Sequence, residues 1–166
     1  KYLLSVTSTN LYVEGAVGVF ASAYSSLTAD YAMDFTTLAN LAIGGNGIDA
    51  PIKYNGTTCR TLKCAAPSTT FSSATGSAGN LTGDYQYQVT FVTESGAETN
   101  PSSSTTVVSP SADQVNLTNI PTGSGEVSSR KIYRTTAGGT VFYHLDTIND
   151  NTTTTYTDDI IDSNLG

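Results

Sequence analysis

The chain has 166 residues, of which 14 are acidic and 7 are basic, so its formal net charge at pH 7 is −7. Charged residues make up only 13% of it, against roughly 25% in an ordinary soluble domain, so its surface must be rich in hydroxyl and amide groups. The acidic balance argues against nucleic acid as a partner, because affinity for phosphate backbones comes from Lys and Arg. No apolar run approaches the roughly 18 residues of a membrane span, so we expect none.

The first part of the chain, residues 1–66, is predicted to form a smaller β-rich N-terminal domain or arm. Its opening run, KYLLSVTSTNLYVEG, predicts two short strands joined at Ser8-Thr9-Asn10. The next run, GAVGVFASAYSSLTADYAMDF, fits a short helix and an extended arm equally well. Turn signals in LANLAIGGNGIDAPIKYNGTTCRTL then separate three strands, one running through Ile43, one over 52–54 and one after Asn55-Gly56.

A small, polar segment rich in Gly and Ser follows, AAPSTTFSSATGSAGNLTG. Such a composition is typical of a flexible linker at a domain boundary. We therefore predict a linker over residues 67–82 and a second domain over residues 83–166.

The second domain begins with the most regular strand pattern of the chain, GDYQYQVTFV. Its alternation places Tyr85, Tyr87, Val89 and Phe91 on one face and polar side chains on the other. A period of two with one apolar face predicts a half-buried strand.

Further strands are predicted in the rest of this domain. Two short runs, TTVVSP and DQVNLTNI, are followed by RKIYRTT and TVFYHLDTI, which flank Ala137-Gly138-Gly139. Glycines that tolerate positive φ suit a tight hairpin at that point. A last strand is predicted in TTTYTDD, with Tyr156 facing inward. Strands every eight to twelve residues without a helical period predict an all-β fold whose second domain is an antiparallel β-sandwich.

The cysteines and the single histidine are interpreted as structural. Cys59 and Cys64 lack the accompanying His that a structural zinc site would need. A disulfide across a tight turn is one alternative, and two reduced, partly buried thiols are the other, which we favour. His144 lies in an alternating strand, where a polar side chain is more often structural than catalytic.

Acidic residues gather toward the C-terminus, and we expect them to form turns and solvated surface. The cluster consists of Asp146, Asp150, Asp158, Asp159 and Asp162. Asp150 stands in NDNTTTT, where Asn and Asp favour turns by bonding their own backbone. A Ca²⁺ site built from Asp150, Asp158 and Asp159 is the alternative, although the spacing matches no known calcium loop.

No pattern in the chain indicates catalysis. No serine stands in a G-x-S-x-G elbow, and the glycines of GGNG at 44–47 lack the Lys-Ser/Thr pair of a phosphate-binding loop. We therefore expect no catalytic, cofactor-binding or metal-ligating residues, no cofactor, and no enzyme activity.

Several motifs together resemble a known group of proteins. These are GDYQYQVTFVTESGAETNPSSSTTVV, VNLTNIP and RKIYRTTAGGTVFYHLDTINDNTTTTYTDDIIDSNLG, with IGGNGIDAPIKYNGTT upstream. They resemble structural proteins of tailed bacteriophages, in which fibronectin type III-like or immunoglobulin-like modules carry similar runs. The resemblance covers roughly residues 40–166 and implies such a sandwich over residues 83–166. It also implies a place in the virion, assembled in the bacterial host cytoplasm, without specifying tail, neck, fibre or capsid decoration.

Two functional hypotheses follow. The first is a virion structural protein that forms homo-oligomers and docks to other virion proteins, with edge strands such as the Thr-rich terminal one as joints; a solvated edge is the alternative. The second is an accessory sandwich that binds a host-surface glycan or receptor. Sugar platforms present flat aromatic rings, and this chain has ten Tyr but no Trp. Because the chain begins at Lys1 and ends in DSNLG, we expect it to be an excerpt of a longer polypeptide.

Overall fold

A computed structural model describes residues 3–166, and this part of the chain is all-β. It holds thirteen strands and one three-residue 3₁₀ helix, η1 (Asp162–Asn164). No helix in the described range is long and apolar enough to cross a membrane. The chain divides into two compact units, Lys1–Lys63 (unit 1) and Cys64–Gly166 (unit 2), which we describe separately.

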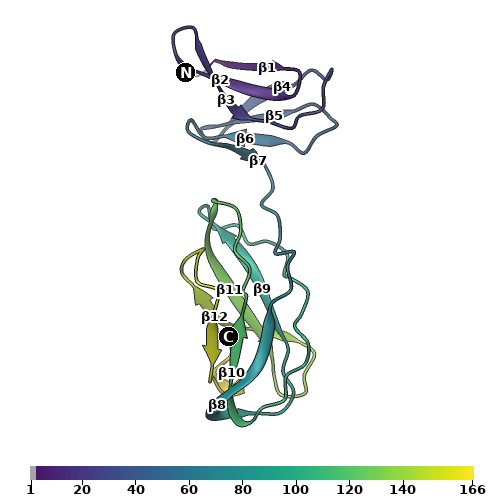
Figure 1. Ribbon diagram of the computed structural model, residues 1–166, viewed down its shortest axis with the longest axis vertical. Helices are drawn as coiled ribbons and strands as arrows, with labels where there is room; N and C mark the ends of the chain where they lie inside the picture. Colours follow the sequence, from purple (N-terminus) through teal and green to yellow (C-terminus); the bar gives the residue numbers. More distant parts are fainter. Residues whose placement is uncertain (1–2) are drawn as a thin grey trace. The chain divides into compact units, whose positions relative to one another are not determined.

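Unit 1 consists of two antiparallel sheets (Figure 1). Sheet A has the order β1-β2-β3 and sheet B the order β4-β5-β6-β7. The strands are β1 (Leu4–Thr7), β2 (Asn10–Ala16), β3 (Val19–Tyr24), β4 (Asp34–Leu38), β5 (Leu41–Gly45), β6 (Ile52–Tyr54) and β7 (Cys59–Thr61). The predicted opening hairpin and the three strands around 43, 52–54 and 59 are confirmed. Residues 15–35, for which the sequence fitted a short helix and an extended arm equally well, form neither. Strand β3 (Val19–Tyr24) instead pairs with β2 and completes sheet A.

The core of unit 1 is small. Leu11, Leu27 and Ile52 form its buried centre, and Leu4, Val6, Tyr24, Met33 and Cys59 pack against it as partly buried side chains. Leu11 belongs to sheet A and Ile52 to sheet B, so the two sheets meet through these side chains.

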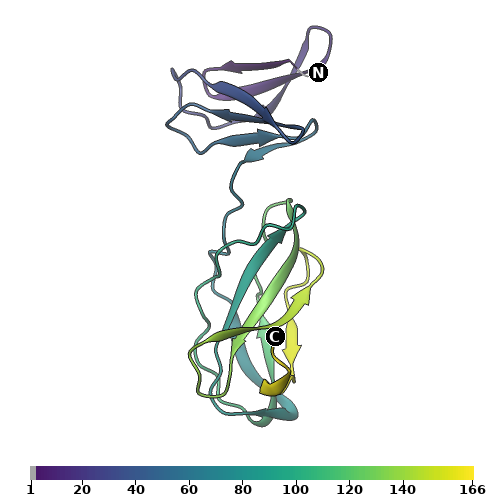
Figure 2. The same ribbon diagram turned by 180° about the vertical axis from the view of Figure 1, so that it is seen from behind.

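Unit 2 is a sandwich of two three-stranded antiparallel sheets, with orders β13-β10-β8 and β12-β11-β9. Figure 2 shows the unit from behind. The strands are β8 (Ser72–Thr82), β9 (Tyr87–Thr93), β10 (Ser111–Thr118), β11 (Val127–Thr135), β12 (Phe142–Ile148) and β13 (Tyr156–Asp158). The predicted Gly-rich hairpin is confirmed, since β11 pairs with β12 and Gly138 has a φ of 67°. At the end of the chain, the backbone of Gly166 exchanges two hydrogen bonds with His144 on β12.

The facing sides of the two sheets share one core, which accounts for the alternation in the sequence. All four side chains predicted to face inward from Tyr85 to Phe91 are buried. The core comprises Phe71, Leu81, Tyr85, Tyr87, Val89, Val108, Val115, Leu117, Ile120, Ile132, Leu145 and Ile148, with Tyr156, Ile160 and Leu165 packed against it. The predicted inward position of Tyr156 is therefore confirmed.

The linker predicted over residues 67–82 is wrong, because most of this range forms strand β8. The strand pairs with β10, and Leu81 lies in the core. Its small residues have a packing reason: a Cβ on Gly76 would stand 2.7 Å from the Asn116 side chain, and one on Gly79 would stand 2.5 Å from that of Asp159. Neighbouring side chains thus lie close to β8 at these two glycines, and the boundary between the units falls at Lys63 and Cys64.

The strand predicted in TTVVSP is also wrong. This segment forms no regular strand, and it pairs through an isolated bridge between Val108 and Tyr85. The backbone from Thr99 to Thr105, the first residue of this segment, still follows β9, since the amides of Thr99, Ser102 and Thr105 donate to β9 carbonyls. Hydroxyls of the same residues accept from β9 amides, so side chains replace part of a regular ladder.

Candidate functional site

The most heavily buried charges lie at the joint between the two sheets of unit 2. Arg134 on β11 and Asp158 on β13 are both 0% exposed, and Arg134 Nη1 lies 2.7 Å from Asp158 Oδ2. Tyr87 on β9 donates its hydroxyl to the same carboxylate at 2.8 Å. Burial, followed by the Asp158 charge, raises the pKa of Tyr87, so this hydroxyl stays protonated.

The remaining bonds of Arg134 hold the segment that follows β13. Its Nη1 donates to the Ile160 carbonyl at 2.7 Å and its Nη2 to Asp162 Oδ1 at 2.6 Å. The guanidinium also stands 4.8 Å from the centre of the Tyr85 ring, a cation–π contact. Because Arg134 is surrounded by partners from its own unit, this cluster is a structural clamp with no place for a substrate.

A second buried arginine organises the loop that the sequence assigned to turn formation. Arg130 donates to Asp150 Oδ1 at 3.0 Å and to the Pro121 carbonyl at 3.1 Å. The Asp150 carboxylate also accepts the backbone amides of Thr152 and Thr153, both at 2.7 Å. The pKa of Asp150 is well below its usual value. The carboxylate accepts hydrogen bonds from Thr153 and Thr152, and it lies beside the Arg130 charge. The turn predicted at Asp150 is confirmed.

The acidic cluster is separated by the fold into different bonds. Asp146 accepts from the Tyr156 hydroxyl at 2.9 Å, and Asp159 accepts from the Asn80 amide at 2.6 Å. The solvation expected for Asp158 is wrong, because that side chain is wholly buried in its ion pair. Among residues 3–166 no group of three or more His, Cys, Asp or Glu side chains is placed to hold a metal ion. The calcium alternative therefore lacks its ligand set.

Cys59 packs against the core of unit 1, and His144 lies on β12 of unit 2. Cys59 and Cys64 are both partly buried, and neither forms a disulfide. Burial raises the pKa of Cys59. The His144 ring lies edge-on to Tyr133 at 5.7 Å, with Nε2 3.1 Å from the Thr147 hydroxyl.

The buried arginines were not singled out from the sequence, although a signal was present. Arg130, Ile132 and Arg134 alternate along one strand, so an inward Ile132 places both guanidinium groups inward as well. All three side chains are fully buried. An Arg on an apolar face implies a carboxylate partner, because an unpaired buried charge is costly.

Charge and exposed apolar surface are divided unequally between the units. Residues 1–63 hold four basic and four acidic residues and are neutral, whereas residues 64–166 hold three basic and ten acidic residues and carry the whole −7. Among residues 3–63 of unit 1, nine large apolar side chains are exposed: Leu3, Val17, Val19, Phe20, Tyr31, Phe35, Leu38, Ile48 and Leu62. The larger unit 2 exposes four such side chains: Val107, Val141, Tyr143 and Ile161. Unit 1 thus exposes more large apolar side chains than the larger unit 2 does.

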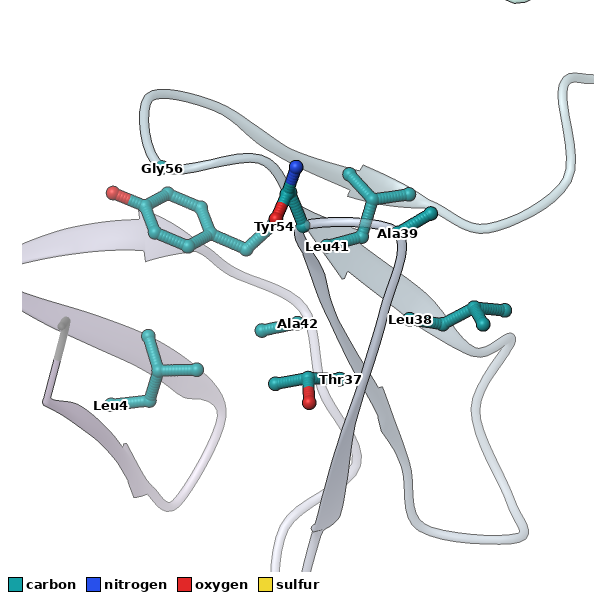
Figure 3. A pocket seen from close by; sticks show the side chains of 9 residues that line it. Leu4, Thr37, Leu38, Ala39, Leu41, Ala42, Tyr54 and Gly56 are labelled. Carbon is teal, nitrogen blue, oxygen red and sulfur yellow. The ribbon is translucent and has the colours of Figure 1, made fainter.

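Unit 1 also contains a hollow of about 380 Å³ with no charged residue in its lining, shown in Figure 3. It is lined by Leu4, Thr37, Leu38, Ala39, Asn40, Leu41, Ala42, Tyr54 and Gly56. Leu4 comes from sheet A, and the remaining residues come from sheet B and its turns. We call this site the apolar hollow. Its side chains can hold an aliphatic group, and they include no nucleophile paired with a base.

No family model matches the chain, and no curated protein matches it significantly. The resemblance to phage structural proteins therefore rests on the quoted motifs alone.

Proposed function

We propose that this chain is a structural component of a tailed bacteriophage virion. It acts by self-assembly and by docking to other virion proteins, in a tail, neck, fibre or capsid decoration, and it has no active site. The resemblance of its motifs supports this proposal. The observation that carries it is the division of the chain into a neutral unit with exposed apolar side chains and an acidic, well-packed unit.

The properties of unit 1 favour association between copies. Burying apolar surface stabilises by about 25 cal/mol per Å². The small core of unit 1 leaves much of this gain unrealised within one copy. Because unit 1 has no net charge, its own surface adds no repulsion between copies, and the repulsion comes from unit 2 alone.

Unit 2 has the opposite properties. Its acidic excess repels other copies, and its buried arginines are held by carboxylates within the same unit. We assign it to the fibronectin type III-like or immunoglobulin-like modules, an assignment that its two antiparallel sheets around one core support. In an assembly, such a module suits the solvated surface.

A glycan-binding module is the alternative function, and exposed aromatic rings would favour it. Among the tyrosines in the described range only Tyr31 and Tyr143 are exposed, and they belong to different units. A flat platform of neighbouring rings is therefore not formed within either unit by these residues.

The deciding experiment is the mass of the purified chain, measured by light scattering over a range of concentrations and by direct imaging. We expect a ring, a tube or another defined oligomer. A monomer at micromolar concentration that is retained on a glycan array would overturn the proposal and favour the binding module.

A further inference from the structure

Two Asn-Gly pairs stand between strands of sheet B in unit 1. Asn46-Gly47 lies in the connection from β5 to β6, and Asn55-Gly56 lies in the turn from β6 to β7. The backbone nitrogen that follows an asparagine can attack its side-chain amide, and a glycine hinders this attack least because it has no Cβ. Each pair is therefore a candidate for spontaneous deamidation.

Deamidation proceeds in two steps and consumes only water. In the first step the glycine nitrogen bonds to the asparagine Cγ, the Cγ–Nδ2 bond breaks, and Nδ2 leaves as ammonia with the proton of the glycine amide. In the second step water opens the resulting cyclic imide at one of its two carbonyls, which leaves aspartate or isoaspartate. Negative charge develops on Oδ1 during the first step, so hydrogen-bond donors around Oδ1 lower the barrier.

The turn at Asn55 surrounds its Oδ1 with donors. The backbone amides of Thr57 and Thr58 donate to Asn55 Oδ1 at 2.9 and 2.8 Å, and the Thr58 hydroxyl lies 3.3 Å from it. Two backbone amides at such distances are the arrangement of an oxyanion hole. Gly56 has a φ of 96°, and within residues 3–166 no group accepts a hydrogen bond from its amide. The Asn55 side chain is exposed, so water can reach the imide.

Asn46 has similar backbone bonds but a different neighbour. Its Oδ1 accepts from the amides of Ile48 and Asp49 at 3.1 and 2.8 Å. Its Nδ2, however, donates to Asp49 Oδ2 at 2.8 Å. Hydrogen bonds from the Thr28 amide and hydroxyl lower the pKa of Asp49, so this carboxylate stays charged. A negative charge this close opposes the charge that develops on Oδ1, and it holds the amide that would have to leave.

We propose that Asn55 is a self-modification site, where the β6–β7 turn promotes deamidation of its own side chain, and that Asp49 protects Asn46 from the same reaction. The reaction requires only this chain and water. It is therefore independent of the proposed function, and its test does not depend on whether copies assemble.

The modification changes both the charge and the backbone of unit 1. Either product adds one negative charge to a unit that is otherwise neutral. Isoaspartate also routes the chain through the side-chain carbons and so lengthens the backbone of the turn by one atom. That turn is closed by the hydrogen bond from the Asn55 amide to the Thr58 carbonyl at 3.2 Å, next to the pairing of Tyr54 with Cys59. The pairing of β7 with β6 should therefore weaken as the chain ages.

The test compares the two sites within one chain. The purified chain is incubated at mildly alkaline pH, folded in buffer and unfolded in guanidinium chloride, and peptide mapping by mass spectrometry follows aspartate and isoaspartate at positions 46 and 55. Both asparagines precede glycine, so they should react at similar rates in the unfolded chain. In the folded chain we expect Asn55 to react at least about tenfold faster than Asn46, a modest effect for two oxyanion donors. Asn55 should also react faster folded than unfolded, and Asn46 slower.

The variant Asp49→Asn tests the protection of Asn46. It removes the negative charge beside the Asn46 amide and keeps a side chain of nearly the same shape. We expect deamidation of Asn46 to accelerate in this variant, while Asn55 keeps the rate that it has in the natural chain. The Asn55 rate thus serves as the internal control that unit 1 is still folded.

Each part of the proposal has a result that overturns it. If Asn55 reacts no faster in the folded chain than in guanidinium chloride, the turn does not promote the reaction and the site is wrong. If Asn46 reacts as fast as Asn55 in the folded natural chain, the protection by Asp49 is wrong. The same holds if Asp49→Asn leaves the Asn46 rate unchanged while Asn55 keeps its own.

Discussion

Arg134 and Asp158 are joined by a 2.7 Å ion pair in which both side chains are completely buried, although they belong to different sheets of unit 2. The two charges compensate each other, so removing one leaves the other buried without a partner. The cost of that state is much larger than the net contribution of the intact pair.

Asp158→Ala should therefore destabilise unit 2 by about 3–5 kcal/mol in urea unfolding. The control is Lys131→Met, which removes the partly exposed Lys131–Glu98 pair and should cost no more than about 1 kcal/mol. Equal, small losses in both variants would contradict the clamp.

Acidification should weaken unit 2 through Asp150. The hydrogen bonds of Thr153 and Thr152 and the Arg130 charge lower the pKa of Asp150 in the folded state. Its stabilising contribution is therefore present above the unfolded pKa of about 3.9 and is lost as the pH falls through the lower folded value. Asp150→Asn should show a smaller drop in stability between pH 7 and pH 2 than the natural chain does. Glu94→Gln changes an exposed carboxylate and should leave the drop as it is.

Tyr133 should titrate late in alkali. Burial, and then the hydrogen bond it donates to Glu98 at 2.6 Å, raises the pKa of Tyr133 to about 12. The stability that this proton contributes is complete below about pH 10 and is lost as the pH rises toward 12. NMR titration of Glu98→Gln should show a lower Tyr133 pKa that still exceeds the ordinary value, because burial remains. An unchanged Tyr133 pKa in this variant would show that the Glu98 bond has no part in the shift.

Strand β8 should not tolerate a side chain at Gly79. An alanine Cβ there would stand 2.5 Å from Asp159 Oδ1 and 2.7 Å from the Gln114 backbone nitrogen. Gly79→Ala should destabilise unit 2 by about 1–3 kcal/mol, as overpacking does elsewhere. Ser77→Ala, at an exposed position on the same strand, should change stability by less than about 0.5 kcal/mol. A neutral Gly79→Ala would mean that this segment is as loosely held as a linker.

The strands with alternating apolar residues could be predicted from the sequence because their own side chains form the core. Tyr85 through Phe91 are the clearest case. Strand β8 could not be predicted in this way, since its Gly76 and Gly79 are explained by Asn116, Gln114 and Asp159, which lie far along the chain. The composition of a segment does not indicate which distant residues will pack against it.

The candidate site was also predictable only where neighbouring residues in the sequence determine the structure. The turn at Asp150 follows from the Thr residues beside it, and it was predicted. The burial of Asp158 was not predicted, because it depends on Arg134, 24 residues earlier. The apolar hollow depends on Leu4 of one sheet meeting the sheet that holds Tyr54, so no single stretch of sequence indicates it.

The clamp at Arg134 also bears on how unit 2 emerges from the ribosome. Its guanidinium lies on the inward face of β11, but its carboxylate partners arrive 24 and 28 residues later. Closing the core before those residues are synthesised would bury an uncompensated charge. Unit 2 must therefore be almost fully translated before its two sheets can close, and a nascent chain that stalls short of Asp158 remains open to chaperones and proteases.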